Sequence, residues 1–280
     1  MKYPNEQTHR GPRLLAAFAA MLLASAPAWS QVAPNLGTAA PYTVLGTNAI
    51  PTSGTVTCTD TGPGIGINGQ VGTTFAGGIT NTGCTISGPI VAPVPAGVVN
   101  DFHTAFANID LQNPVCTGVI PIVTTTLAPG IYCSAAGTTI GAGVTITLLG
   151  SASDVWVFRV GTGGPGALTL TGAHVVMGGA ASPCNVYWKT SAGATTTDSD
   201  FVGTVLSGAA ATMTRGTWIG RMIATTDATL TDPAPITGCV FAGAANANAA
   251  AAPTLSEWAM IMLAALLAVA GLAAMRRRAR

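Results

Sequence analysis

Charged side chains are scarce in this sequence and make up only 8% of its residues. Residues 31–252 hold eight aspartates, four lysines or arginines and no glutamate, which gives this region a formal charge of −4. A nucleic-acid partner is not predicted, because phosphate binding needs clustered lysine and arginine. The low charge does not indicate disorder, since 49% of the chain is hydrophobic and rich in Val, Ile and Leu.

Catalytic motifs are also missing. The chain has no Gly-x-Ser-x-Gly elbow or carboxylate cluster, and the glycine-rich residues 62–66 lack the helix and lysine of a phosphate loop. Asp101 and His103 are two residues apart on a predicted helix, so they point in different directions. His174 has no acid or nucleophile near it in the sequence. We therefore predict that the protein is not an enzyme and needs no cofactor.

Long apolar runs occur only at the two ends of the chain. Residues 1–13 contain basic side chains, residues 14–24 are almost wholly apolar, and small residues follow at 28 and 30. This order is typical of a secretory signal peptide, and we expect cleavage after Ser30. The predicted domain borders are a signal peptide at 1–30, a β-helix domain at 31–243, a linker at 244–252 and a C-terminal signal at 253–280.

The C-terminal segment predicts a second targeting step. Residues 259–275 form an uncharged run that just suffices for a transmembrane helix, which needs about 17–25 residues. The arginines at 276–280 should stay cytoplasmic, so the body lies on the far side of the inner membrane and touches the membrane only through this segment. A short motif precedes the run: Pro253, Thr254, Leu255, Glu257 and Trp258.

That motif, helix and arginine cluster resemble the IPTL-type C-terminal sorting signal, although Ala252 stands where the family has isoleucine. The resemblance implies an exosortase-like sorting protease as partner. The protease would remove the tail and leave the protein secreted or at the cell surface. The alternative is a plain membrane anchor.

All six cysteines lie in the region expected to be exported. No Cys-x-x-Cys occurs and the three histidines are far from any cysteine, so no metal site is predicted. An even number of cysteines in an oxidising compartment predicts three disulfides. Their spacing leaves the pairing open, and our working hypothesis is neighbour pairing: 58–84, 116–133 and 184–239.

An internal repeat indicates the fold. Residues 194–197 recur at 211–214 and at 228–231, and residues 201–207 are matched by 218–224, in each case with a spacing of 17 residues. The β-branched, glycine-punctuated composition favours a short threonine strand, a turn and a longer apolar strand in each unit. Such a unit is one coil of a β-solenoid, and stacked coils bury one side of each strand.

One segment departs from the strand pattern. Pro95 to Leu111 carries apolar residues at a helical spacing, and Asn113-Pro114 supplies a stop signal. We expect one amphipathic helix there, lying along the solenoid.

The body resembles the microbial ice-binding-protein family over about residues 35–240. The matching stretches are residues 36–45, 64–72, the helix around Asp101-Phe102, 127–132, 155–158, 184–188, 201–206 and Gly220-Arg221. The resemblance implies a mainly β fold, an irregular right-handed β-helix with one long α-helix packed alongside. It implies ice as a ligand but marks no binding face.

The threonine repeats suggest a binding face. Alternate residues of a strand point the same way, so stacked coils would place hydroxyls and methyls on one uncharged surface, with Thr196, Met213 and Leu230 facing inward. The candidate ice-binding residues are Thr195, Thr197, Thr212, Thr214, Thr229 and Thr231. The alternative is an inward ladder, or threonines that merely reflect β-propensity.

Two functions remain open from the sequence. The first is adsorption to an ice crystal surface through this flat threonine face. The second is a surface or matrix adhesion module that binds polysaccharide or protein. Carbohydrate sites usually display exposed aromatic rings, so the exposure of Trp188 and Trp218 discriminates between the two. Arg221, which lies within an apolar strand, is interpreted as a structural anchor to a carbonyl or an aspartate.

Overall fold

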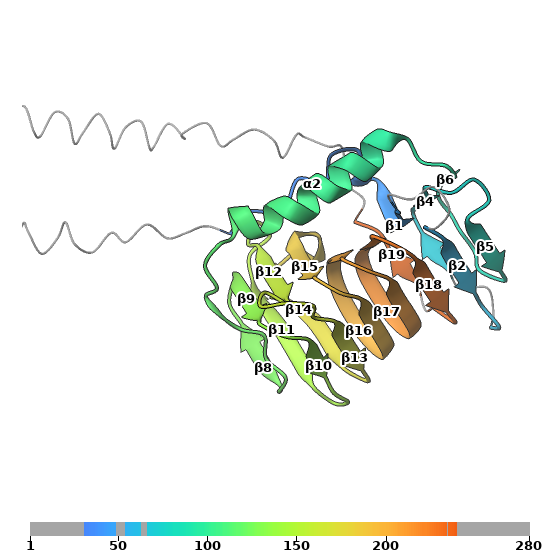
Figure 1. Cartoon of the computed structure of the whole chain (residues 1–280). Helices are drawn as coiled ribbons and strands as arrows, with labels where there is room; N and C mark the ends of the chain where they lie inside the picture. The colour runs from blue at the N-terminus through green and yellow to red at the C-terminus, as the bar shows by residue number, and fades with distance from the viewer. Residues whose placement is uncertain (1–30, 49–53, 63–65, 234, 240–280) are drawn as a thin grey trace, which may run out of the picture.

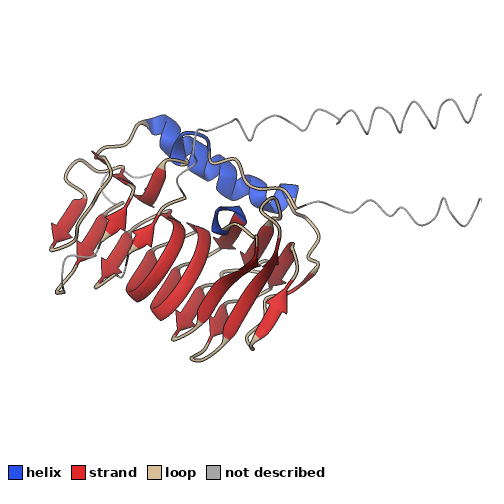
Figure 2. Cartoon of the chain, turned by 180° about the vertical axis from the view of Figure 1, so that it is seen from behind, coloured by secondary structure: helices blue, strands red, loops and turns tan. Residues whose placement is uncertain are grey.

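The structure, a computed structural model, describes residues 31–239 apart from residues 49–53, 63–65 and 234. Within this part the chain forms a β-helix of parallel strands with the long helix α2 (Ala96–Gln112) lying along one side, as Figures 1 and 2 show. The mainly β solenoid and the accompanying helix are both confirmed. The predicted signal peptide and the C-terminal sorting segment lie outside the described residues.

The coils have three faces. The ladder face carries the threonine repeats and consists of β10 (Thr138–Ile140), β13 (Leu168–Thr171), the first part of β16 (Ala194–Ser207), the first part of β17 (Ala211–Ala224), β18 (Ala228–Thr231), β2 (Val56–Thr59) and β5 (Ile79–Thr82).

The helix face lies under α2 and consists of β7 (Gly118–Val119), β9 (Gly130–Ser134), β12 (Trp156–Val160), β15 (Val186–Thr190), the last parts of β16 and β17, β1 (Tyr42–Gly46), β4 (Gln70–Thr73) and β6 (Ile90–Val91). The third face consists of β8 (Thr125–Leu127), β11 (Thr145–Gly150), β14 (His174–Gly179), the middle of β16 and β17, β19 (Ile236–Thr237) and β3 (Ile67–Asn68). The described residues also form two short 3-10 helices, η1 (Gly37–Ala39) and η2 (Pro183–Asn185).

The order of the coils in space differs from their order in the chain. The chain starts in the middle of the stack, winds to one end at β6, crosses to the other end through α2 and winds back from β7 to β19. Its last strands then pair with its first: β17 with β1, β18 with β2 and β19 with β3. The stack therefore contains one seam where neighbouring coils are not consecutive in sequence.

The repeated units are joined more smoothly than the sequence suggested. We predicted separate strands with a turn between them, but β16 and β17 each continue through the corner as one 14-residue strand. Asp198 and Arg215 make the corner by adopting positive φ angles of 50° and 53°. Non-glycine residues rarely occupy this region, although aspartate does so more readily than most.

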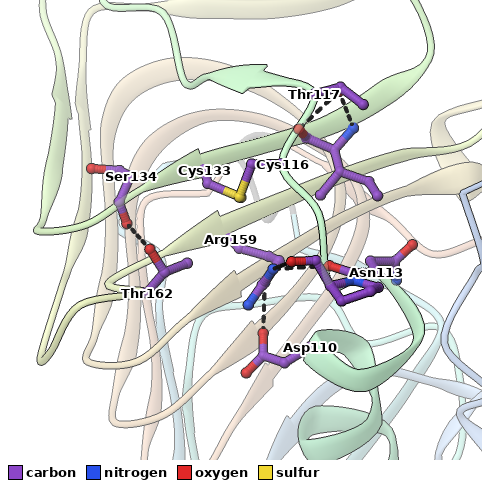
Figure 3. The surroundings of a disulfide bond; sticks show 10 residues. Asp110, Asn113, Cys116, Thr117, Cys133, Ser134, Arg159 and Thr162 are labelled. Atoms are coloured by element: carbon purple, nitrogen blue, oxygen red, sulfur yellow. Dashed lines mark hydrogen bonds and ion pairs between the residues drawn. A yellow bond between two sulfur atoms is a disulfide. The ribbon is translucent and has the colours of Figure 1, made fainter.

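The helix is held on the solenoid by apolar packing and by charge. Val98, Phe102, Ala105 and Ile109 recur every three to four positions and are buried against outward residues of the helix face such as Tyr187. At the C-terminal end of α2, Asp110 forms ion pairs with Arg159, at 2.7 Å, and with Lys189. Figure 3 shows Arg159 beside Asp110 and Asn113, whose carbonyl accepts a second bond of 2.8 Å from the guanidinium.

Three disulfides close the described chain with the pairing that we hypothesised: Cys58–Cys84, Cys116–Cys133 and Cys184–Cys239. Cys116–Cys133 ties the segment after α2 to β9 (Figure 3). Within the described part of the chain, no helix is long and apolar enough to cross a membrane. The apolar run at 259–275 lies outside that part.

Candidate functional site

The ladder face presents two parallel rows of threonine side chains. The strand register places one threonine of each strand beside that of the next, which gives a first row of seven: Thr139, Thr169, Thr195, Thr212, Thr229, Thr57 and Thr80. The second row, two residues further along each strand, has six: Thr171, Thr197, Thr214, Thr231, Thr59 and Thr82. We call these thirteen residues the threonine grid, and each strand's contribution a rung.

The orientation of the grid follows from the alternation of burial. In the central strands the inward positions Thr196, Met213 and Leu230 are 2%, 0% and 0% exposed, as predicted. The six candidate threonines of the repeats all lie on the opposite, outward side and are partly exposed. An inward threonine ladder is therefore wrong for these positions.

The structure adds seven threonines that the repeat did not reveal. Thr-x-Thr also occurs at 169–171, 57–59 and 80–82, and the grid gains Thr139 from β10. The coils that carry these residues differ in length, and β2 and β5 precede the helix in the chain. A fixed period therefore does not connect them, although the Thr-x-Thr tripeptides were a usable signal.

The grid has regular spacings along and across the strands. Neighbouring strands lie about 4.8 Å apart, and alternate residues of one strand lie about 6.6 Å apart, twice the rise per residue. Seven rungs therefore extend over about 29 Å. Because every grid position is threonine, the surface offers methyls and hydroxyls and carries no ionisable group. Side chains branched at Cβ are also restricted at χ1, which keeps this surface ordered.

Charged side chains border the grid at the corner that follows the second row. Arg215 donates two hydrogen bonds to Asp198, of 2.6 and 2.8 Å, in a bidentate pair. The Arg215 guanidinium holds the pKa of the Asp198 carboxyl below its ordinary value, first through these bonds and then through its charge. The charges thus lie beside the grid and not within it.

The two tryptophans that would mark a carbohydrate site are buried. Trp188 and Trp218 are 0% and 1% exposed, and their indole nitrogens donate to the carbonyls of Val202 and Gly203. Trp188 stacks on Phe158 with ring centroids 3.7 Å apart. These rings belong to an interior aromatic column and present no surface to a sugar.

Arg221 is a buried anchor, as the sequence suggested. Its guanidinium donates to the carbonyls of Ala40, at 2.7 Å, and Cys239, at 2.8 Å. Burial lowers the pKa of this guanidinium, and the two carbonyls compensate part of the lost hydration. Arg221 therefore ties the beginning and the end of the described chain together next to the seam.

One polar pair on the third face was not foreseen. Nδ1 of His174 lies 2.8 Å from Oδ2 of Asp200, which is 26 residues away in sequence, and Oδ1 of Asp200 accepts from Thr217. Within the described residues no serine or cysteine hydrogen-bonds to His174. The pair is half-exposed and joins neighbouring strands across the third face.

Comparison with known proteins identifies the body and the tail separately. The model of the Ice-binding-like family matches residues 36–237, and that of the IPTL-CTERM motif matches residues 250–278. Ice-binding protein 1 of Shewanella frigidimarina is 28% identical over 236 residues, which is 74% of this chain and 26% of that protein. An ice-binding protein of Flavobacterium frigoris is 38% identical over 109 residues, which is 38% of this chain and 37% of that protein.

Solved structures agree with these matches. The corresponding domain of the Shewanella frigidimarina protein superposes with a TM-score of 0.60 at 25% identity, and the match covers 75% of this chain and 98% of that one. An ice-binding protein from an Antarctic biological consortium gives a TM-score of 0.61 at 26% identity over 75% of this chain and 92% of that one. The chain belongs to the Ice-binding-like family and carries an IPTL-CTERM motif.

Proposed function

We propose that this protein adsorbs to ice through the threonine grid. The observation that carries the proposal is the pair of in-register threonine rows on one regular, uncharged face. Repeated methyls and hydroxyls at fixed spacings can order water into a matching layer, whereas charges would hold water in their own hydration shells. The names of both curated relatives point to the same ligand.

Adsorption requires no chemical step. A molecule held on a growing crystal blocks the addition of water beneath it, so shape and rigidity of the face determine the activity. The grid is supported from below by a layer of buried apolar side chains that includes Met213 and Leu230. This mode of action needs neither a cofactor nor a catalytic residue, in keeping with a non-enzymatic function.

The alternative, an adhesion module for polysaccharide or protein, finds less support. The two tryptophans that the sequence offered for stacking on sugar rings, Trp188 and Trp218, are interior residues. We also propose that the protein is exported, and that an exosortase-like protease removes the C-terminal segment and releases the body to the cell surface. The IPTL-CTERM match supports this second proposal.

The test is to disturb the centre of the grid without disturbing the fold. Replacing Thr212 and Thr214 by tyrosine places two bulky rings on the middle rung, and we expect thermal hysteresis and crystal shaping to be lost. Each change points outward from a partly exposed position and should cost about 0.5 kcal/mol of stability or less. Thr104→Tyr, on the exposed side of α2, is the matched control and should keep full activity.

Two outcomes would contradict the proposal. Activity that survives both tyrosines, in a variant whose circular dichroism matches the wild type, would place the ice contact on another face. A folded, disulfide-intact wild type with no thermal hysteresis would exclude ice binding, and a carbohydrate array would then test adhesion. Thr212→Val should retain more activity than Thr212→Tyr, because valine keeps the shape of threonine.

A further inference from the structure

The threonine grid is assembled from two parts of the chain that are distant in sequence. Rungs from β10 to β18 come from residues 138–231, whereas the last two rungs, on β2 and β5, come from residues 56–82. Between β16, β17 and β18 a 17-residue coil connects each rung covalently to the next. The seam between β18 and β2 has no such connection, so its alignment depends on non-covalent contacts.

Side-chain pattern alone does not fix the register at this seam. β18 reads Ala-Thr-Leu-Thr and β2 reads Val-Thr-Cys-Thr, and both alternate inward and outward residues in the same phase. A slip by one residue would expose the buried positions, but a slip by two would keep the inward and outward sets unchanged. Such a slip would pair Thr57 with Thr231, which belong to different rows, and would displace the N-terminal rungs.

Two aspartates lie at the ends of β18 and bind the chain at both ends of β2, across the seam. Asp227 directly precedes β18, and its Oδ1 accepts hydrogen bonds from the backbone N–H and the hydroxyl of Thr55, each of 2.9 Å. Asp232 directly follows β18, and its Oδ1 accepts the N–H and the hydroxyl of Thr61, each at 2.8 Å. Bonds to a carboxylate are stronger than neutral ones, and each aspartate fixes one end of β2.

The equivalent positions in neighbouring coils show why these contacts belong to the seam. Gly193 and Ala210 stand where Asp227 stands and have no side-chain acceptor. Arg215 and Asp198 stand where Asp232 stands in the two preceding coils, also with positive φ, but they pair with each other. Aspartates that accept backbone hydrogen bonds at both ends of the next strand are therefore found at the one junction of the grid that the chain does not cross.

We infer that Asp227 and Asp232 are positioning residues of the ice-binding surface. Their clamps on Thr55 and Thr61 hold the N-terminal rungs, which carry Thr57, Thr59, Thr80 and Thr82, in register with the rest. Asp227 and Asp232 thereby determine whether the grid extends in register over all seven rungs. The inference rests on the proposed function for its statement about ice, but the register it describes can be measured separately.

The experiment uses the mature protein with its disulfides intact. Asp227→Ala with Asp232→Gly removes both carboxylates, and glycine accepts the positive φ of residue 232 without strain. Asp198→Gly is the matched control, because it removes a carboxylate with the same backbone conformation from the equivalent corner of another coil. Hydrogen exchange of β2 and β5 and thermal hysteresis are measured for each.

We expect exchange at the amides of β2 and β5 to speed up about tenfold in the double variant, with β16 and β17 unchanged. Thermal hysteresis should fall without disappearing, because the rungs from β10 to β18 remain. Asp198→Gly should change neither measurement at the seam. Asp227→Asn with Asp232→Asn should restore most of both, since each clamp uses a single oxygen that an amide also provides.

Each contrary result has a distinct meaning. Unchanged exchange in β2 and β5 would overturn the clamp, whatever the ice activity. Faster exchange with undiminished hysteresis would overturn the assignment of these rungs to the ice surface. A wild type without thermal hysteresis would overturn the proposed function, but hydrogen exchange of β2 and β5 would still test the register at the seam. If the double variant does not fold, Thr55→Val with Thr61→Val removes only the two hydroxyl bonds and is expected to shift both readouts in the same direction.

Discussion

Thr196 provides a sharp test of how the grid is built, because it is the inward residue of an all-threonine tripeptide. Its side chain is 2% exposed and its hydroxyl is buried without a hydrogen-bond partner. Its neighbours in the register are Leu170 and Met213, which are apolar. A buried unpaired hydroxyl costs about 1–3 kcal/mol, so Thr196→Val should stabilise the protein.

The expected gain is about 1–2 kcal/mol, because the added methyl requires some adjustment in a packed layer. For a domain of this size, that corresponds to a rise in Tm of about 2–8 °C. Differential scanning calorimetry of the oxidised protein measures it, with Thr195→Val as an outward control that should gain nothing. A Tm equal to or below that of the wild type would refute the reasoning, and altered thermal hysteresis would show that Thr196 is not an interior residue.

Three further predictions follow from charge, cross-links and processing. The pKa of Asp101 is lowered first by the Thr38 hydroxyl bond, and that of Asp232 first by the Thr61 backbone bond. The stability that these two ionised carboxyls contribute is therefore present above the ordinary aspartate pKa of about 3.9, and it is lost as the pH falls through their lowered pKa values. Tm should hold from pH 7 to 5 and decline below pH 4, and a constant Tm down to pH 2 would contradict this. Loss of one disulfide should lower the free energy of unfolding by about 3–4 kcal/mol, and most for Cys184–Cys239 because it closes the longest loop. Denaturant titration of variants with each cysteine pair replaced by alanine measures these losses, and a larger loss for either of the other two disulfides would contradict the prediction. Mass spectrometry of surface material should find an N-terminus near Gln31 and no residues beyond about Pro253, whereas a retained tail would indicate a membrane anchor.

The regular part of the fold could be predicted from the sequence because its signal is local. The 17-residue spacing of Thr195, Thr212 and Thr229 equals one turn of the coil, so residues aligned in the sequence are neighbours in the register. The helix was equally readable, since Val98, Phe102 and Ile109 keep the spacing of one helical face and Pro95 precedes its first turn. Both signals depend on residues close together in the chain.

The remainder of the site could not be predicted, because it depends on contacts between distant segments. Thr169 and Thr195 are paired although they are 26 positions apart, and Thr57 pairs with Thr229, which is 172 positions away in the sequence. Because the coils differ in length, these threonines do not recur at a fixed period. No local sequence pattern indicates that the last coil pairs with the first. The corner at Asp198 was read as a turn for a similar reason, since positive φ at an aspartate leaves no clear mark in the sequence.

The placement of the helix explains how such a discontinuous stack stays aligned. A helix of 17 residues is about 26 Å long, close to the roughly 29 Å over which the seven rungs extend. In its first half, Asp101 accepts two hydrogen bonds from Thr38, which belongs to the coil at the seam. Near its end, Asp110 pairs with Arg159 and Lys189 of the coils that precede the repeats. Because α2 spans both sides of the seam, a shift of the N-terminal coils against the others would have to break one of these anchors as well as the clamps on β2. The crossover helix and the seam are thus two consequences of one topology, and the anchors of the helix help to hold the register that the seam leaves without a covalent connection.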